Sequence, residues 1–126
     1  FNKNKVILET IVYNFFEVIV MEINEYQELA MVTLNKSLKE KDVLINSVMG
    51  LCGESGEVID IVKKHLAQGH DLNKEKMIEE LGDVAWYLAE AATALNVSLE
   101  EILIKNIEKL KKRYPDGFNK YNSINR

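Results

Sequence analysis

The chain has 126 residues, 47% of them hydrophobic and 29% charged, and a formal net charge of −4. This length predicts one domain with a real core, small enough that oligomerisation would help to stabilise it. The negative charge argues against general affinity for nucleic-acid polymers. The single cysteine, Cys52, excludes an internal disulfide and a multi-cysteine zinc site. It fits a reducing cytoplasm, and we expect it to be a small buried residue.

Residues 1–20 are rich in apolar side chains, but Glu9, Asn14 and Glu17 interrupt them. No uninterrupted apolar span of about 20 residues exists there, and no small-residue cleavage site follows. This pattern predicts neither a membrane span nor a targeting segment. We expect residues 1–20 to be an appendage, with Met21 a candidate natural start and the domain proper at residues 21–126.

The rest of the chain predicts four helices. The first covers about residues 24–35, with Asn24 as N-cap, and the second about residues 43–66, where apolar residues recur every three or four positions. Residues 67–73 form a loop, and Asn73 is the expected cap of a third helix over about residues 74–95.

The fourth helix begins at the capping box Ser98-x-x-Glu101 and ends at about Arg113, before Pro115 and Gly117. A single proline and only six glycines favour long helices, so the chain is predicted to be an all-α, four-helix bundle.

Two pairs of carboxylates lie at the edges of the apolar faces of the second and third helices. Glu54 and Glu57 are one turn apart on the second helix, and Glu80 and Asp83 are one turn apart on the third. If these helices pack antiparallel, the two pairs can meet. Four converging carboxylates would repel one another strongly, so the arrangement indicates a site for a divalent cation. Oxygen ligands favour Mg²⁺, Mn²⁺ or Ca²⁺. The alternative is that these side chains form a solvated surface.

A di-iron bundle also uses carboxylates from facing helices, but it needs Glu-x-x-His. Val62 and Ala67 precede His65 and His70 by three residues, so the sequence excludes that site. We expect both histidines to be exposed or to cap helix ends.

Glycines bracket the first carboxylate pair, although glycine costs about 1 kcal/mol relative to alanine inside a helix. They are Gly50, Gly53 and Gly56. We expect Gly53 and Gly56 to permit the close approach of another helix or of a phosphate.

The segments GESGEVIDIVKK and EELGDVAWYLAEAA resemble the MazG-like family of all-α nucleoside triphosphate pyrophosphohydrolases. The family signature is E-x-x-E, a variable spacer and E-x-x-D, and the similarity extends over about residues 24–126. The resemblance implies cleavage of a nucleoside triphosphate between the α- and β-phosphates. It also implies a homodimer or homotetramer with sites at subunit interfaces.

The resemblance implies that Glu54, Glu57, Glu80 and Asp83 hold Mg²⁺, with Mn²⁺ as a substitute, and that Glu54 or Glu57 acts as the base on water. The region from Lys105 onward is strongly basic, so the triphosphate is expected to bind there. The candidates are Lys109, Lys112, Arg113 and Arg126. Favourable interaction with a helix C-terminus explains these residues equally well.

Tyr87 is a candidate for contact with the base or sugar. Asn24 and Gln27 are candidates for hydrogen bonds to the base, although a polar helical surface explains these two equally well. Trp86 is expected to serve packing or an interface. Two alternatives to the pyrophosphohydrolase remain, namely a non-catalytic helical nucleotide-binding or interaction module and a phosphohydrolase that releases orthophosphate. The intact set of four carboxylates favours an enzyme.

Overall fold

The structure is a computed structural model that describes residues 21–125. The predicted appendage, residues 1–20, and the predicted phosphate ligand Arg126 lie outside the described residues. The helices are α2 (Ile23–Met31), α3 (Glu40–Gln68), α4 (Lys74–Ala94), α5 (Leu99–Arg113) and α6 (Lys120–Ile124). Residues 21–125 contain no strand, so the all-α prediction is confirmed. None of their helices is both long and apolar enough to cross a membrane.

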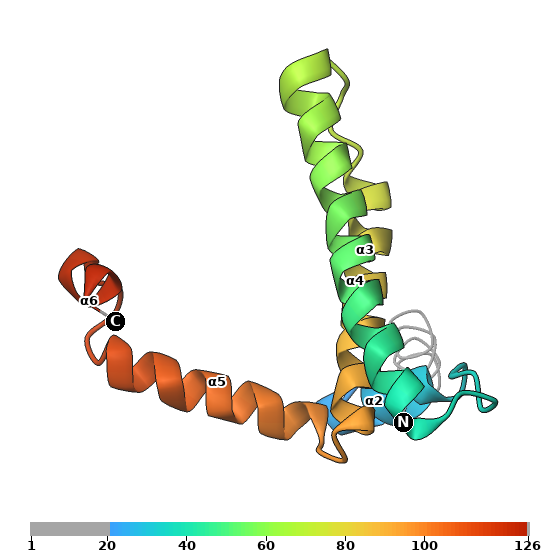
Figure 1. Ribbon diagram of the computed structural model, residues 1–126. Helices are drawn as coiled ribbons and strands as arrows, with labels where there is room; N and C mark the ends of the chain where they lie inside the picture. The colour runs from blue at the N-terminus through green and yellow to red at the C-terminus, as the bar shows by residue number, and fades with distance from the viewer. Residues whose placement is uncertain (1–20, 126) are drawn as a thin grey trace, which may run out of the picture.

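The long helices α3 and α4 form an antiparallel hairpin, and α2 lies across its base (Figure 1). The next helix, α5, starts at this base and runs away from the hairpin, with α6 at its far end (Figure 1). The four predicted helices are therefore present, but α5 contacts the others only near its own beginning. Among residues 21–125, one side of the hairpin and most of α5 have no packing partner.

The helix starts follow from local capping. The Asn73 side chain accepts a hydrogen bond from the Lys76 backbone N–H at 3.0 Å, and Ser98 Oγ accepts from the Glu101 N–H at 3.0 Å. Both predicted N-caps are therefore confirmed. Gly69 adopts the left-handed conformation (φ 72°) that ends α3.

The first helix differs from the prediction at both ends. Its N-cap is Glu22, whose backbone N–H donates to the Glu25 carboxylate at 3.4 Å, so the assignment of Asn24 as the cap was wrong. Asn24 instead donates to Glu100 Oε2 at 2.8 Å and ties α2 to the start of α5. The helix ends at Met31 because the next three N–H groups bond to carbonyls three residues back, which makes a turn.

The chain leaves α5 at Pro115 and Gly117 as predicted, but it then forms α6, which was not predicted. Asn119 caps α6 by accepting from the Asn122 N–H at 3.2 Å, and the Asn122 side chain donates to the Arg113 carbonyl at 2.9 Å. A helix of five residues is too short to show a periodic pattern, which explains the omission.

The core lies where α2, α4 and α5 meet. Its fully enclosed members are Ala89, Ala92 and Leu99, against which Tyr26 and Leu88 pack. Much of the apolar surface of the hairpin is exposed; these side chains include Ile45, Val48, Met49, Ile59, Leu66, Ile78 and Leu81. The predicted burial of Cys52 was also wrong, because it lies on an outward face of α3. Within the part of the chain that the structure describes, much of the apolar stripe of the hairpin is therefore exposed.

A buried polar contact connects the two arms of the hairpin near its base. The Asn46 side-chain amide of α3 donates to both carboxylate oxygens of Glu90 on α4, each at 3.0 Å. Glu90 is completely buried, and so is the neighbouring Ser47. Because a buried carboxylate needs hydrogen-bond partners, this contact helps to fix the register of α3 against α4.

The Ser98 cap offers a simple test of the α5 start. We expect Ser98→Ala to lower the free energy of unfolding by about 1 kcal/mol, because the Glu101 N–H loses its acceptor. Urea denaturation followed by circular dichroism measures the change. Ser98→Asp keeps an acceptor and is the matched control; equal losses in both variants would contradict the capping role.

Candidate metal centre

Three carboxylates from the two arms of the hairpin converge. One oxygen from each of Glu54, Glu80 and Asp83 lies within 4.8 Å of the others. Glu54 comes from α3, and the other two come from one turn of α4. Glu80 is buried, Glu54 is half-buried and Asp83 is exposed, so the group opens to solvent on one side. The predicted meeting of the two helix edges is present, and its oxygen donors fit a hard divalent cation.

The charges in this group are poorly compensated. The pKa of Glu54 is raised by desolvation first, and then by repulsion from Asp83 and Glu80 and by a hydrogen bond with Glu80. Repulsion of this kind favours any cation that can bind between the carboxylates. The arrangement is therefore suited to a metal ion on electrostatic grounds as well as by ligand type.

Glu57 lies one turn beyond Glu54 on α3 and is not a member of the group of three. It is exposed, and its charge contributes weakly to raising the pKa of Lys64, after the larger effects of Asp60. Asp60 itself is held by Lys63 and Lys64, which lower its pKa to about 2. A role for Glu57 as a metal ligand or base remains a prediction.

A hollow of about 440 Å³ lies directly beside the carboxylates. It is lined by Thr33, Glu54, Asp83, Trp86 and Tyr87. The two aromatic rings meet edge to face, with centroids 5.0 Å apart. Trp86 Nε1 donates to the Ala30 carbonyl at 3.0 Å and to Thr33 Oγ1 at 2.9 Å, which fixes the indole against the end of α2. Trp86 therefore packs against α2, as predicted, and also forms part of the wall next to Tyr87.

The Tyr87 ring lies against the backbone of Gly50. A Cβ atom added at Gly50 would be 2.1 to 2.4 Å from three atoms of that ring. Gly53 and Gly56 are different, because a Cβ atom there would have no neighbour within 4 Å. Among the described residues, then, Gly50 is the glycine that a close approach requires, and the expected helix contact at Gly53 and Gly56 is not seen.

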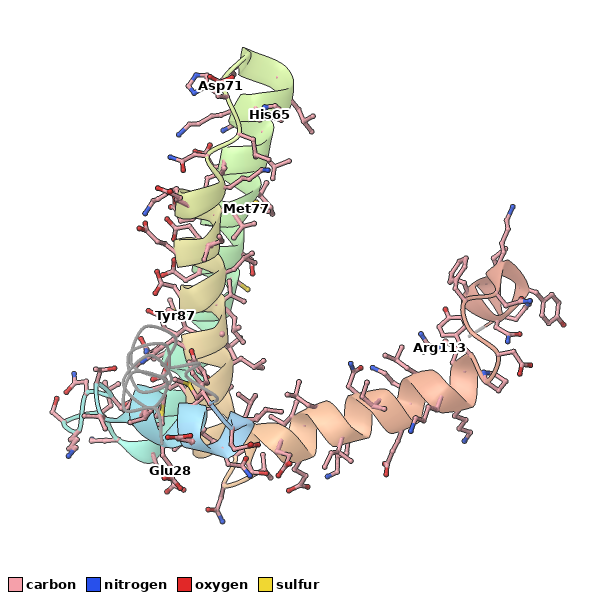
Figure 2. The ribbon with its side chains drawn as sticks, turned by 180° about the vertical axis from the view of Figure 1, so that it is seen from behind. Glu28, His65, Asp71, Met77, Tyr87 and Arg113 are labelled. Carbon is pink, nitrogen blue, oxygen red and sulfur yellow. The ribbon has the colours of Figure 1, made fainter. Side chains whose placement is uncertain are left out.

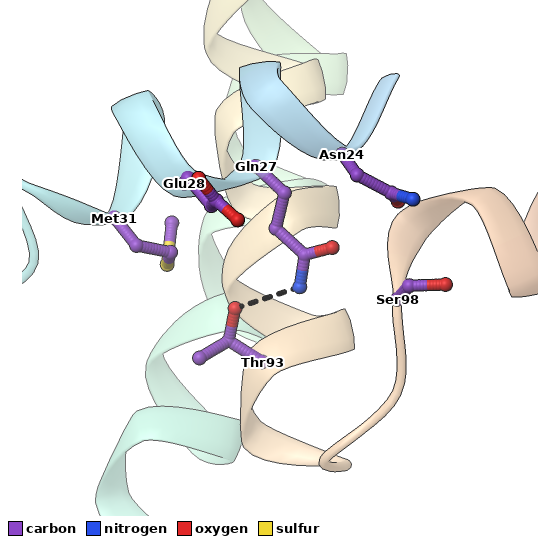
Figure 3. A pocket seen from close by; sticks show the side chains of 6 residues that line it. All are labelled: Asn24, Gln27, Glu28, Met31, Thr93 and Ser98. Carbon is purple, nitrogen blue, oxygen red and sulfur yellow. Dashed lines mark hydrogen bonds between the residues drawn. The ribbon is translucent and has the colours of Figure 1, made fainter. Parts of the chain in front are cut away.

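Gln27 and Asn24 border a second hollow, of about 480 Å³, at the base of the hairpin. Figure 3 shows the Gln27 amide directed at Thr93, to which Nε2 donates at 3.0 Å. The same nitrogen donates to the Val97 carbonyl at 3.2 Å, and Oε1 accepts from the Leu99 N–H at 2.6 Å. The amide thus ties α2 to the α4–α5 loop. Thr93 lies ten residues beyond Asp83, about 15 Å along a helix; a substrate contact by Gln27 remains a prediction.

The predicted phosphate ligands on α5 lie far from the carboxylates of their own chain. Lys109, Lys112 and Arg113 belong to the last turns of α5, and Figure 2 shows Arg113 at the end that points away from Tyr87 and the hairpin. Arg113 lies over the Tyr114 ring at 5.9 Å. For these residues to bind a triphosphate at the carboxylates, a second copy of the chain would have to supply them.

One cation near the carboxylates was not predicted. Lys76 Nζ lies 2.7 Å from Glu80 Oε1. The signal was present in the sequence, because Lys76 and Glu80 are four residues apart on the third predicted helix, a spacing that brings side chains together.

The uncompensated charge leads to a prediction for the metal-free protein. We expect Glu54→Gln to raise the melting temperature in EDTA, because the variant lacks one of the mutually repelling charges. The same variant should show a much smaller rise in melting temperature when Mg²⁺ or Mn²⁺ is added. Differential scanning fluorimetry measures both. A variant that melts at or below the wild-type temperature in EDTA would contradict the repulsion.

Comparison of the sequence with known proteins identifies a relative and a family. The chain is 40% identical over 73 residues to the "Gene 37 protein" of Mycobacterium phage L5, which corresponds to 55% of this chain and 64% of that protein. The chain therefore spans less than two thirds of the length of this relative. No solved structure shows significant similarity to the present chain. The family model for the MazG nucleotide pyrophosphohydrolase domain matches residues 44–118, more than half of the chain and all three clustered carboxylates. On this match, the chain belongs to the MazG nucleotide pyrophosphohydrolase family.

Proposed function

We propose that the protein hydrolyses nucleoside or deoxynucleoside triphosphates between the α- and β-phosphates, with Mg²⁺ as cofactor, in cytoplasmic nucleotide-pool cleaning. The observation that carries the proposal is the convergence of Glu54, Glu80 and Asp83 within 4.8 Å across the α3–α4 hairpin. Family membership supports the reaction type. The adjoining hollow with Tyr87 and Trp86 supports a ligand that has an aromatic or sugar group next to its phosphates.

In the proposed reaction, a water oxygen bonds to the α-phosphorus and the bond from that phosphorus to the bridging oxygen breaks. The products are a nucleoside monophosphate and pyrophosphate, and the proton of the water passes to Glu54 or Glu57. Glu54, Glu80 and Asp83, with Glu57 as a further ligand, would hold Mg²⁺, which would neutralise charge on the phosphates and orient them. Tyr87, placed by Gly50, is positioned to contact the sugar or base.

The protein is proposed to act as a homodimer or homotetramer. The exposed apolar side chains of α3 and α4 support this, because monomeric proteins seldom leave so many together. The basic end of α5 supports it as well, because Lys109, Lys112 and Arg113 belong to the end of α5 that points away from the hairpin with Glu54, Glu80 and Asp83. Light scattering coupled to size-exclusion chromatography is expected to give two or four times the chain mass.

A nucleotide panel tests the proposed function. The purified protein is incubated with canonical and modified dNTPs and NTPs and Mg²⁺, and the products are resolved by ion-exchange chromatography. Nucleoside monophosphate with pyrophosphate is the expected result. Diphosphate with orthophosphate would identify a phosphohydrolase instead, and no turnover of any nucleotide would favour the non-catalytic module.

A further inference from the structure

The ammonium of Lys76 already occupies the edge of the carboxylate group. Its Nζ lies 2.7 Å from Glu80 Oε1 and 3.5 Å from Glu79 Oε2. The Glu80 side chain is 7% exposed, whereas that of Lys76 is 53% exposed. The ion pair thus joins a buried carboxylate to a cation whose stem reaches the solvent.

Glu80 is the member of the group that most needs a countercharge. It is buried beside two other carboxylates, and a buried charge is costly unless it is paired. Two other lysines of the hairpin, Lys63 and Lys64, both pair with Asp60. Among the ion pairs of the described residues, the Lys76 pair is the one that reaches Glu54, Glu80 or Asp83.

The first turn of α4 holds Lys76 in this place. The Asn73 side chain accepts from the Lys76 N–H at 3.0 Å, and Glu80 is one turn further along the same helix. The anchor is therefore local and does not depend on a second chain. The ammonium end, by contrast, is carried on four methylene groups and can move by several ångströms without disturbing the helix.

A divalent cation bound by Glu80 would compete with this ammonium for the same oxygen. The two positive charges would repel each other at so short a separation. Lys76 would then turn toward the exposed side of the site, where a triphosphate would provide several anionic oxygens.

From this geometry we propose that Lys76 acts as a substitute cation. Its ammonium neutralises Glu80 in the metal-free protein, gives way when a divalent cation binds, and then binds a phosphate of the substrate. The inference rests on the proposed metal site at Glu54, Glu80 and Asp83. It assigns to α4, in the same chain, a phosphate-binding role that the sequence pattern assigns to the basic region from Lys105 onward.

Metal binding in the absence of nucleotide tests whether the Lys76 ammonium competes with the metal for Glu80. If the Lys76–Glu80 ion pair is formed about 90% of the time, metal binding is weakened about tenfold, because Glu80 is free to bind the metal only in the remaining fraction of molecules. We therefore expect Lys76→Met to bind Mn²⁺ about tenfold more tightly than wild type by isothermal titration calorimetry. Its melting temperature in EDTA should be lower, and its rise with Mn²⁺ larger.

The matched control is Lys74→Met, which removes a lysine from the same turn and is expected to match wild type in both measurements. Unchanged or weaker Mn²⁺ binding by Lys76→Met would overturn the proposal. Failure of the proposed function is separate from this outcome. It would appear as a wild-type protein that binds Mn²⁺ but turns over no nucleotide, whereas the competition between Lys76 and the metal is measured on binding alone.

Steady-state kinetics at saturating Mg²⁺ test whether Lys76 then binds a phosphate of the substrate. Lys76→Met is expected to raise KM for the preferred triphosphate about tenfold with a smaller change in kcat, the result of losing one charged contact to phosphate. Lys76→Arg should restore most of the affinity, which a merely structural role would not require. An unchanged KM in Lys76→Met would overturn the phosphate contact.

Discussion

The Asp83→Asn variant is expected to lose about 100-fold or more of the pyrophosphohydrolase activity, because the metal loses a charged ligand. Asparagine has nearly the same shape as aspartate, and Asp83 is the exposed member of the group, so the fold should persist. Since the substitution removes a negative charge from a repelling group, the metal-free variant should be no less stable than wild type. The loss should be partly relieved at high Mg²⁺ or Mn²⁺ concentrations.

The measurement is kcat/KM against metal concentration, together with circular dichroism and the melting temperature in EDTA. Glu79→Gln is the matched control, since Glu79 lies beside Glu80 on the same helix with its side chain 68% exposed. It should retain near wild-type activity. If Asp83→Asn kept more than half of the activity, or if Glu79→Gln lost as much, the three-carboxylate site would be wrong.

The features that were predicted correctly depend on neighbours in the sequence. The caps at Asn73 and Ser98 are bonds to an N–H three residues away, and apolar spacing gave the extent of α4 almost to the residue. The meeting of Glu54 with Glu80 and Asp83 could be predicted because a five-residue loop between two long helices leaves little choice but an antiparallel hairpin.

The features that were missed depend on contacts between distant segments. The spacing of apolar residues on α5 shows an amphipathic helix, but it does not tell whether the apolar face packs on its own chain or on another. The local spacing of apolar residues therefore does not predict that α5 runs away from the hairpin. Glu90 is similar, because its burial depends on the Asn46 amide 44 residues earlier in the chain.

Gly50→Ala is expected to destabilise the protein by about 1–3 kcal/mol, the usual range for overpacking. Alanine favours a helix over glycine by about 1 kcal/mol, so in the absence of a contact the substitution would be stabilising. The expected change in the free energy of unfolding has the opposite sign here, because the added Cβ would lie 2.1 to 2.4 Å from three atoms of the Tyr87 ring. Either the ring must leave its rotamer or α3 must move away from α4, and the first of these would also disturb the wall of the hollow beside the carboxylates.

The neighbouring glycines provide the control, because Gly53→Ala introduces the same methyl group into the same helix with no atom within 4 Å. It should therefore stabilise the protein by up to about 1 kcal/mol. Urea denaturation at one fixed protein concentration measures both variants, so that any change in assembly is held constant. Destabilisation by Gly53→Ala as large as that by Gly50→Ala would show that something other than Tyr87 limits this helix.

A double-mutant cycle with Tyr87→Ala separates the ring contact from all other effects of the new methyl group. With the ring removed, Gly50→Ala should change from destabilising to stabilising, by up to about 1 kcal/mol. The triphosphate KM should rise in Gly50→Ala and in Tyr87→Ala alike, and the double variant should be no worse than Tyr87→Ala alone. If Gly50→Ala were equally destabilising with and without the ring, Gly50 would not be the residue that positions Tyr87 beside the metal site.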